Sequence, residues 1–444
     1  MRIIRVQIKK LFGMFDHDIR LNTKDRITII HGPNGVGKTT VLKLIHDLFS
    51  RKFLSLSSVP YKSISVSLDS DIQLTVTRVL EGPEDKRAKL LFEMRGETKF
   101  KPHEINPTES MRAMERHIPL SAIEEIIPYL DRAGPQKWVD RSTDEILSME
   151  EVFLRYGDEL PSRIRRMVRV PEELEGILKA VPINFIQTQR LFVSPRVEDY
   201  RPSYPPTRNR PTVERYSEEM IERMQEALRQ SGTVAASLDR TFPNRLLETE
   251  IPSHATEKKI REIYEEQSKY RGRLMAAGLI DAQEPVPLPK GEVDYNVRKV
   301  LWHYLNDVNK KFEVFDPLLQ KVELFKEIIN TRFLYKSFSL DKREGFVFSS
   351  EESGKIPLRS LSSGEQHELV LSYELIFRVP QNSLILIDEP ELSLHVTWQH
   401  RFLEDIARIS QLVDLDFLIA THSPSIIHDR HNLMVGLPNN RNNA

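Results

Sequence analysis

The chain contains no cysteine, which excludes disulfide bonds, thiolate metal sites and cysteine nucleophiles. No apolar run approaches the roughly 18 residues that a membrane-spanning helix needs. The opening segment Met1–Arg5 also lacks the apolar stretch of a signal peptide. We therefore expect a cytoplasmic protein without a membrane partner. The formal net charge is only -1, so any contact with nucleic acid must come from local basic patches.

The sequence does contain a glycine-rich loop near its N-terminus, between a predicted strand at 26–30 and a predicted helix at 40–49. The loop residues are Gly32, Pro33, Asn34, Gly35, Val36, Gly37, Lys38, Thr39 and Thr40. Its glycines let successive backbone N–H groups point at phosphate oxygens. Lys38 can bridge the β- and γ-phosphates of a nucleotide, and Thr39 can offer a hydroxyl to Mg²⁺. The loop therefore predicts a phosphate-binding site.

Two acidic residues and a histidine follow predicted buried strands near the C-terminus. Asp388 and Glu389 come after the apolar run 384–387, and His422 comes after a predicted last strand at 416–420. Carboxylates at the carboxyl end of a parallel strand lie where open α/β sheets bind ligands. Asp388 can hold Mg²⁺ through water, and Glu389 can deprotonate an attacking water. His422 can contact the γ-phosphate or that water.

A serine- and glycine-rich segment precedes these acids. Ser362, Ser363, Gly364 and Glu365 open a predicted helix, where a hydroxyl, flexible backbone N–H groups and the helix N-terminus all favour an anion. The alternative is a simple helix cap, with Ser363 and Gln366 as the capping box. Because the segment lies shortly before Asp388, we predict that it senses phosphate.

The remaining sequence indicates a β-rich part followed by helices. Segments 63–68 and 72–77 alternate strictly and predict a hairpin, with a third antiparallel strand at 89–94. Residues 100–180 predict short helices and loops, and 183–186 predict a strand that leads into Gln187 and Gln189.

Three further segments have apolar residues at three- or four-residue steps, and residues 196–212 between the strand and these segments predict an exposed linker. The helical segments are 213–228, 260–274 and 300–312. They predict either a short antiparallel coiled coil or amphipathic helices that pack on the core.

The order of these motifs resembles an ABC-type ATPase head: phosphate loop, glutamine loop, Leu361–Gln366 signature, Asp-Glu-Pro strand and switch histidine. The insert between the halves is similar to that of the SMC-like and OLD-like branch. Segments 388–395 and 420–424 resemble the bacterial AAA-type ABC ATPases of anti-phage systems such as PARIS and Septu, and segments 185–191 and 238–243 are also similar.

The resemblance implies an α/β fold, an ABC-type P-loop ATPase head with a mixed sheet and an antiparallel β subdomain, split by a helical or coiled-coil insert. The implied domains are an N-terminal half of the head (1–100), a helical region with the glutamine loop (101–200), the insert (201–332) and a C-terminal half of the head (333–444).

The resemblance also implies that two heads enclose two ATP molecules with Mg²⁺. Lys38, Thr39, Asp388, Glu389 and His422 would act from one subunit, with Thr39 and Asp388 at the metal. The signature residues Ser362, Ser363, Gly364 and Glu365 would reach ATP bound to the partner, and segment 391–395 would lie at the dimer seam. Gln189 would be the glutamine that contacts Mg²⁺ and assists catalysis, with Gln187 as its rival. Phe12 and Phe15 are candidates for stacking on adenine.

The implied partners are a homodimer or higher homo-oligomer, a separate nuclease-like effector, and a phage protein or DNA as trigger. Segment 425–444 has no acidic run that could hold the two metals of an OLD-type nuclease. One alternative is a DNA-repair or chromosome-maintenance ATPase that clamps DNA through arginine clusters. The other is a stand-alone enzyme or toxin with its activity in 100–330. The candidate DNA-binding clusters are Arg163, Arg165, Arg166 and Arg169, and Arg196, Arg201, Arg208 and Arg210.

Overall fold

The computed structural model divides into two compact units. The first comprises Met1–Pro206 and Val379–Ala444, and the second comprises Thr207–Arg378. The described residues are 1–80, 88–96, 100–107, 109, 123, 127, 130–141, 145–156, 170–187, 211–282, 287–288, 294–352, 354–392 and 396–437.

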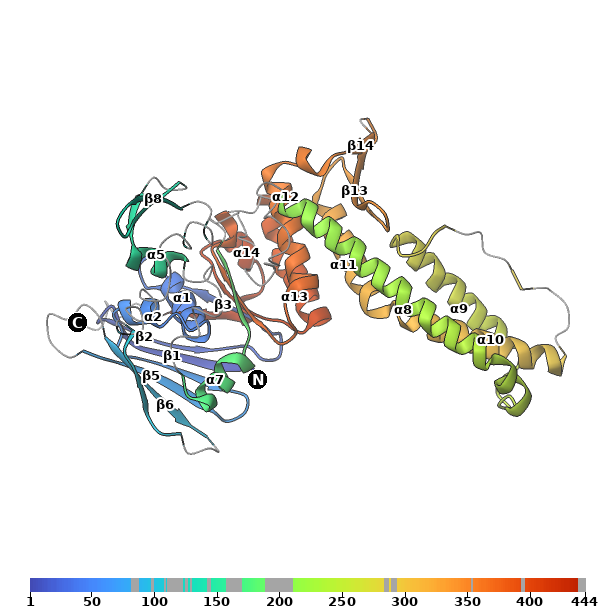
Figure 1. Cartoon of the computed structure of the whole chain (residues 1–444), viewed down its shortest axis with the longest axis horizontal. Helices are drawn as coiled ribbons and strands as arrows, with labels where there is room; N and C mark the ends of the chain where they lie inside the picture. Colours follow the sequence, from blue (N-terminus) through green and yellow to red (C-terminus); the bar gives the residue numbers. More distant parts are fainter. Residues whose placement is uncertain are drawn as a thin grey trace. The chain divides into compact units, whose positions relative to one another are not determined.

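The first unit contains a six-stranded antiparallel sheet in the order β2-β1-β4-β5-β6-β7 (Figure 1). Its strands are β1 (Ile3–Leu11), β2 (Phe15–Arg20), β4 (Ser63–Leu68), β5 (Gln73–Val79), β6 (Lys89–Arg95) and β7 (His103–Ile105). One face of β4 is buried and the other is half-exposed, because its residues alternate between apolar and serine. The predicted hairpin and its third strand are confirmed, since β4, β5 and β6 pair in sequence order.

The same unit contains a five-stranded parallel sheet in the order β11-β15-β16-β3-β17. Its strands are β3 (Ile27–His31), β11 (Ile183–Gln187), β15 (Leu384–Asp388), β16 (Asp416–Ala420) and β17 (Met434–Gly436). The interior strands read as unbroken apolar runs because both of their faces are buried. The prediction that 416–420 is the last strand is wrong, since β17 adds a short strand beside β3.

Helix α1 packs against the parallel sheet and shares one hydrophobic core with both sheets. Its buried side chains recur at three- and four-residue steps, for example Val41, Leu44, Ile45 and Leu48. The helices of this unit outside the small sheet described next are α1 (Lys38–Phe49), α2 (Phe53–Ser58), α7 (Glu172–Ala180), η4 (Pro390–Leu392), α13 (Val396–Val413), α14 (Pro424–Ile427) and η5 (His431–Leu433).

A small antiparallel sheet in the order β10-β9-β8 lies between β7 and α7 in the sequence. It consists of β8 (Leu130–Gly134), β9 (Lys137–Asp140) and β10 (Glu145–Ser148), followed by helix α5 (Met149–Tyr156). Trp138 of β9 is fully buried in a cluster that includes Leu130 of β8, Leu147 of β10 and Val152 of α5. The prediction of mostly short helices and loops in 100–180 missed these strands, because they are short, largely exposed and carry little apolar alternation.

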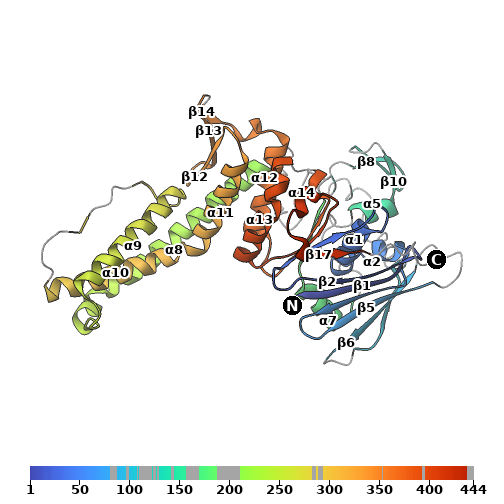
Figure 2. The same ribbon diagram turned by 180° about the vertical axis from the view of Figure 1, so that it is seen from behind.

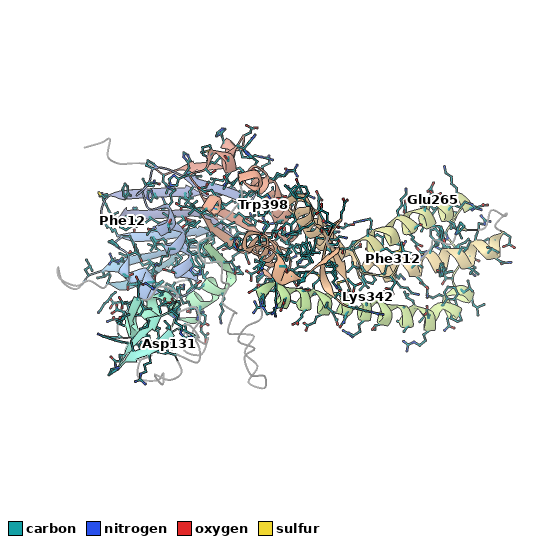
Figure 3. All side chains as sticks on the ribbon, turned by 90° about the horizontal axis from the view of Figure 1, so that it is seen from above. Phe12, Asp131, Glu265, Phe312, Lys342 and Trp398 are labelled. Carbon is teal, nitrogen blue, oxygen red and sulfur yellow. The ribbon has the colours of Figure 1, made fainter. Side chains whose placement is uncertain are left out.

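The second unit is built from long helices (Figure 2), of which α8 packs on α10 and α10 packs on α9. The helices are α8 (Thr212–Glu248), α9 (Glu257–Ala276), α10 (Tyr295–Glu313) and α11 (Asp316–Arg332). In this unit Phe312 stacks on Tyr270 with ring centroids 5.1 Å apart (Figure 3). The predicted helical segments are confirmed, whereas a coiled-coil form of the insert stays a prediction.

The second unit ends in a three-stranded sheet and the helix that carries the signature. Its elements are β12 (Ser337–Asp341), β13 (Gly345–Ser350), β14 (Gly354–Ile356), η2 (Leu358–Ser360), α12 (Ser363–Tyr373) and the π-helix η3 (Glu374–Arg378). Because α12 packs on α8 and α11, residues 333–378 belong to the helical unit. The segment 333–444, predicted as one half of the head, is thus divided between the two units.

Candidate nucleotide site

The phosphate loop joins β3 to α1 in the first unit. Gly37 precedes the first helical residue, Lys38, with a left-handed φ of 93°, and no side chain caps the helix. The first N–H groups of α1 are therefore available to donate hydrogen bonds to a ligand. Helix N-termini bind phosphate in this way. The left-handed φ favours glycine there, and a side chain at Gly37 would place its Cβ 2.7 Å from the Leu11 side chain, which would have to shift.

Lys38 turns back over its own loop. Its Nζ donates hydrogen bonds to the carbonyl oxygens of Gly32 at 2.9 Å and Pro33 at 3.2 Å. Burial lowers the pKa of Lys38, and the nearby carboxylates of Glu389 and Asp388 oppose that shift. The ammonium is thus held at the loop by neutral oxygens, which phosphate oxygens can replace with a stronger, charge-assisted contact.

Thr39 and Asp388 meet although 349 positions separate them in the sequence. The Thr39 hydroxyl donates to Asp388 Oδ1 at 3.1 Å. Parallel pairing of β15 with β16 and of β16 with β3 brings the end of β15 to the phosphate loop. Burial raises the pKa of Asp388, and the negative charges of Glu389 and Glu391 add to the effect.

This pair fits Mg²⁺. Hydroxyl and carboxylate oxygens are the hard ligands that the ion prefers, and Mg²⁺ in nucleotide sites usually takes one or two protein ligands beside phosphates and water. The crowded carboxylates favour a cation. Among the described residues no group of three or more His, Cys, Asp and Glu side chains could hold a metal alone, so the ion would need the nucleotide as a further ligand.

Glu389 follows Asp388 with a left-handed φ of 45°, and its amide donates to the carbonyl of Ala420 at 2.8 Å. A glutamate in this region of φ is uncommon and strained, as found at functional sites. The bond fixes the backbone of Glu389 against the end of β16. The predicted base Glu389 and the predicted switch residue His422 therefore lie at the ends of two adjacent strands.

The switch segment (Thr421–Ser423) follows β16 and is held by Glu391. Thr421 Oγ1 donates to Glu391 Oε2 at 2.8 Å, and the His422 amide donates to Glu391 Oε1 at 2.9 Å. Thr421 is fully buried. These bonds place His422 at the same edge of the sheet as Asp388 and Glu389.

A buried histidine supports the phosphate loop from β2, and the sequence reasoning missed it. His17 Nε2 lies 2.9 Å from the carbonyl oxygen of Val36, and burial lowers the pKa of His17. The ring is therefore neutral near pH 7, and Nε2 carries the proton donated to that carbonyl. The available signal was the alternation of β2, in which His17 occupies an inward position between Phe15 and Ile19.

The two candidates for adenine stacking differ in exposure. Phe15 is buried and stacks on His17, so its ring is already packed. Phe12 is 40% exposed, lies at the turn between β1 and β2, and comes within 3.3 Å of the Cβ position at Gly37 (Figure 3). Of the two rings, Phe12 therefore presents a free face beside the phosphate loop.

The signature lies in the second unit, at the start of α12. Ser362 is the N-cap, and its side chain and that of Glu365 form a capping box. The predicted pairing of Ser363 with Gln366 is wrong, because the Gln366 side chain instead donates to the carbonyl of Leu361. Ser362, Ser363 and Gly364 are exposed, and a Cβ on Gly364 would meet nothing within 4 Å.

The Glu365 side chain bonds within the second unit. Lys336 Nζ donates to both of its carboxylate oxygens, at 2.6 and 2.7 Å. Burial acts to raise the pKa of Glu365, but the Lys336 and Ser362 contacts outweigh it and lower the pKa. The ionised Glu365 thus stabilises the helix start, and the three residues before it form the accessible face of the signature.

Several predicted residues lie outside the described part of the chain. These are Gln189, segment 393–395 and the two arginine clusters. Only the main chain of Gln187 is among the described parts. It pairs with the main chain of Asp388, because β11 runs beside β15.

Two family models match the chain. Residues 235–428 match a model described as "AAA domain, putative AbiEii toxin, Type IV TA system", and residues 1–56 match one described as "AAA domain". The first match contains the signature, the acidic strand end and the switch segment, and the second contains the phosphate loop. No curated protein matches the chain. Both ends of the sequence therefore carry the pattern of AAA-type ATPase domains.

Similar solved structures include three SMC heads. The Pyrococcus furiosus Smc head with an extended coiled coil, bound to the C-terminal domain of ScpA, has 13% identity and a TM-score of 0.37, covering 99% of this chain and 94% of that one. The Thermotoga maritima SMC head has 12% identity and a TM-score of 0.35, covering 98% and 94%. An SmcHead bound to the C-winged helix domain of ScpA has 11% identity and a TM-score of 0.37, covering 98% and 94%. TM-scores of this size do not establish a shared fold.

None of the helices in the described ranges combines the length and the apolar character that a membrane span requires.

Proposed function

We propose that the chain is a Mg²⁺-dependent ATPase in which two copies enclose two ATP molecules. The observation that carries the proposal is the 3.1 Å contact between the Thr39 hydroxyl and the Asp388 carboxylate at the start of α1. It brings a phosphate loop and a metal-binding carboxylate together from opposite ends of the sequence. Both regions match AAA-domain models.

Each residue at this edge has a distinct chemical task. Lys38 exchanges its carbonyl partners for the β- and γ-phosphate oxygens. Thr39 and Asp388 would hold Mg²⁺, which would neutralise phosphate charge. Glu389 accepts a proton from the water whose oxygen attacks the γ-phosphorus. The bond from that phosphorus to the β–γ bridging oxygen then breaks and releases ADP.

The two remaining motifs complete the site. His422 donates a hydrogen bond to the γ-phosphate or the attacking water. Ser362, Ser363 and Gly364 contact the γ-phosphate held by the partner copy, which fits their exposure at the N-terminus of α12. Such a contact gives ATP a higher affinity for the closed dimer than for the monomer, as a ligand-driven switch requires.

The closed dimer would act as a scaffold that controls a separate nuclease-like effector in anti-phage defence. Two observations support this part of the proposal. The motif segments 388–395 and 420–424 resemble defence ATPases, and the model matching 235–428 names a toxin–antitoxin system in its description.

The same description favours a second candidate, in which this chain is itself the toxin. The two candidates predict different results when the chain is expressed without its genomic neighbours. A toxin arrests growth alone, whereas a scaffold does so only together with its effector. Lys38→Ala is the control in both cases, because it removes nucleotide binding.

The deciding experiment measures the native mass of the Glu389→Gln protein, co-expressed with its genomic neighbours, with and without ATP-Mg²⁺. This variant should bind ATP but turn it over far more slowly. We expect an ATP-dependent dimer or larger assembly that retains a neighbour's product. A monomer with ATP bound would refute the shared site, and normal turnover would refute the role of Glu389. A dimer that carries nothing would favour the DNA-clamping alternative, to be tested by salt-sensitive DNA binding.

Two glycines allow a matched test of the signature. Gly364 and Gly232 both lie in helices, are exposed, and have no atom within 4 Å of a Cβ position. Gly364→Arg should abolish the ATP-dependent dimer because the side chain would fill the face offered to the partner's nucleotide. Gly232→Arg should leave the dimer intact. Equal effects of the two substitutions would contradict the trans role of the signature.

A further inference from the structure

The short helix η4 carries a carboxylate that faces the switch segment of its own chain. Glu391 accepts one hydrogen bond on each oxygen, from Thr421 Oγ1 at 2.8 Å and from the His422 amide at 2.9 Å. Both donors belong to the stretch that places the His422 imidazole. The motif resemblance puts Glu391 at a dimer seam, but these contacts give it a task within the subunit.

The Glu391 contacts belong to a closed ring of hydrogen bonds that includes α13. The Ser423 amide donates to Thr421 Oγ1 at 3.0 Å, and the Ser423 hydroxyl donates to Gln399 Oε1 at 3.1 Å. Gln399 Nε2 donates back to the carbonyl of Glu391 at 3.2 Å. Such a ring fixes the backbone on both sides of His422, because moving one member breaks bonds of the others.

We propose that Glu391 is a positioning residue that sets the backbone of His422 and thereby aims its imidazole at the reacting phosphate. The inference rests on the proposed ATPase function. A carboxylate suits the task because it accepts from two donors at once, and charge-assisted bonds of this kind are roughly twice as strong as neutral ones. Partners that orient metal ligands typically change activity by about 10- to 100-fold when mutated, and we expect a loss of the same order for Glu391.

Glu391 also contributes charge to the site, and this effect has to be separated from positioning. Its carboxylate adds to the burial and the charge of Glu389 that raise the pKa of Asp388, and it opposes the burial that lowers the pKa of Lys38. Glu391→Ala removes both the charge and the acceptors. Glu391→Gln removes the charge but keeps one acceptor oxygen, so it should retain more activity if positioning dominates.

The test is a kinetic double-mutant cycle with His422. Glu391→Ala should lower kcat for ATP by about 10- to 100-fold and change KM less than about threefold, because Lys38 and the loop still bind the nucleotide. In a His422→Ala background the same substitution should have no further effect on kcat. Equal fold-changes in the two backgrounds would overturn the inference and leave the ATPase proposal standing.

Thr421 provides a conservative pair. Thr421→Ser keeps the hydroxyl that bonds Glu391 and should retain near-normal kcat. Thr421→Val removes the hydroxyl at nearly constant volume and should lower kcat as Glu391→Ala does. If Thr421→Ser and Thr421→Val were equally impaired, packing rather than hydrogen bonding would explain the loss and the inference would fail.

Hydrogen exchange of the His422 amide tests the contact without relying on turnover. The amide should exchange slowly in the full-length wild-type chain and much faster in Glu391→Ala. Unchanged exchange would overturn the inference whatever the kinetics show. If His422→Ala had wild-type kcat, the proposed role of His422 would fall, and the exchange rate alone would decide whether Glu391 holds this backbone.

Discussion

The helix that starts with the signature is tied to α11 by a buried ion pair, and breaking that pair should be costly. Arg332 of α11 pairs with Glu368 of α12, and their side chains are only 5% and 2% exposed. Glu368 Oε1 also accepts a hydrogen bond from Ser372 at 3.0 Å. Glu368→Leu removes this carboxylate from beside a buried guanidinium and leaves the Ser372 hydroxyl without its acceptor.

The expected loss is large. Removing one partner of a buried ion pair costs about 3–5 kcal/mol, which corresponds to a drop in melting temperature of roughly 6–20 °C for a unit of this size. Arg359 and Glu214 provide a matched control in the same unit, since they also form an Arg–Glu pair but the Arg359 side chain is 65% exposed. Glu214→Leu should cost no more than about 1 kcal/mol.

The assay is thermal and urea unfolding of the full chain, followed by hydrogen exchange in 363–373 so that the signal reports on α12. The double variant Arg332→Met/Glu368→Leu should recover most of the loss, because apolar replacement of both partners removes both buried charges. Equal small losses in Glu368→Leu and Glu214→Leu would refute the reasoning. They would mean that water or another group compensates Arg332 after the substitution.

Three further outcomes follow from the structure. Gly278→Ala should destabilise by more than about 1–2 kcal/mol in a urea titration, since Gly278 has a φ of 76° and a Cβ there would clash with the carbonyl oxygen of Leu340, whereas Gly232→Ala should stabilise α8 by about 0.5–1 kcal/mol in the same titration. Burial lowers the pKa of His17 and of His367, so both bind a proton less readily in the fold than in the unfolded chain, whose histidines titrate near pH 6.5; stability should fall as pH drops from 7.5 to 5.5, and the melting temperature of His17→Phe should fall less. Chelating Mg²⁺ should weaken ATP binding by at least about tenfold in a fluorescent-nucleotide titration, because the metal neutralises phosphate charge, and an unchanged affinity would contradict the assignment of the metal ligands.

The sequence predicts the parts of the site that depend on local pattern. The glycine spacing around Lys38 and the apolar run before Asp388 each define a strand end, and parallel pairing then brings the two ends together. The hairpin 63–77 could likewise be read from alternation, since its strands bury one face.

Features that depend on distant partners could not be read in the same way. The capping box uses Ser362 rather than Ser363. Its other member, Glu365, also forms an ion pair with Lys336, which lies just before β12. Ser362 and Ser363 have equal capping propensity, so local sequence cannot decide between them. The contact of Glu391 with the switch segment is equally hidden, because it joins residues 30 and 31 positions apart.

The charges at the phosphate loop favour the proposed pairing of nucleotide and cation. The Lys38 ammonium interacts electrostatically with the carboxylates of Glu389, Asp388 and Glu391. Burial disfavours the charged form of Asp388. A polyphosphate entering alone would add negative charge to three carboxylates that face one lysine, and such like charges repel strongly where water is excluded. A divalent ion held by Thr39 and Asp388 would offset that negative charge. We therefore expect nucleotide and metal to bind as one unit, at the same sheet edge as the switch segment that Glu391 holds.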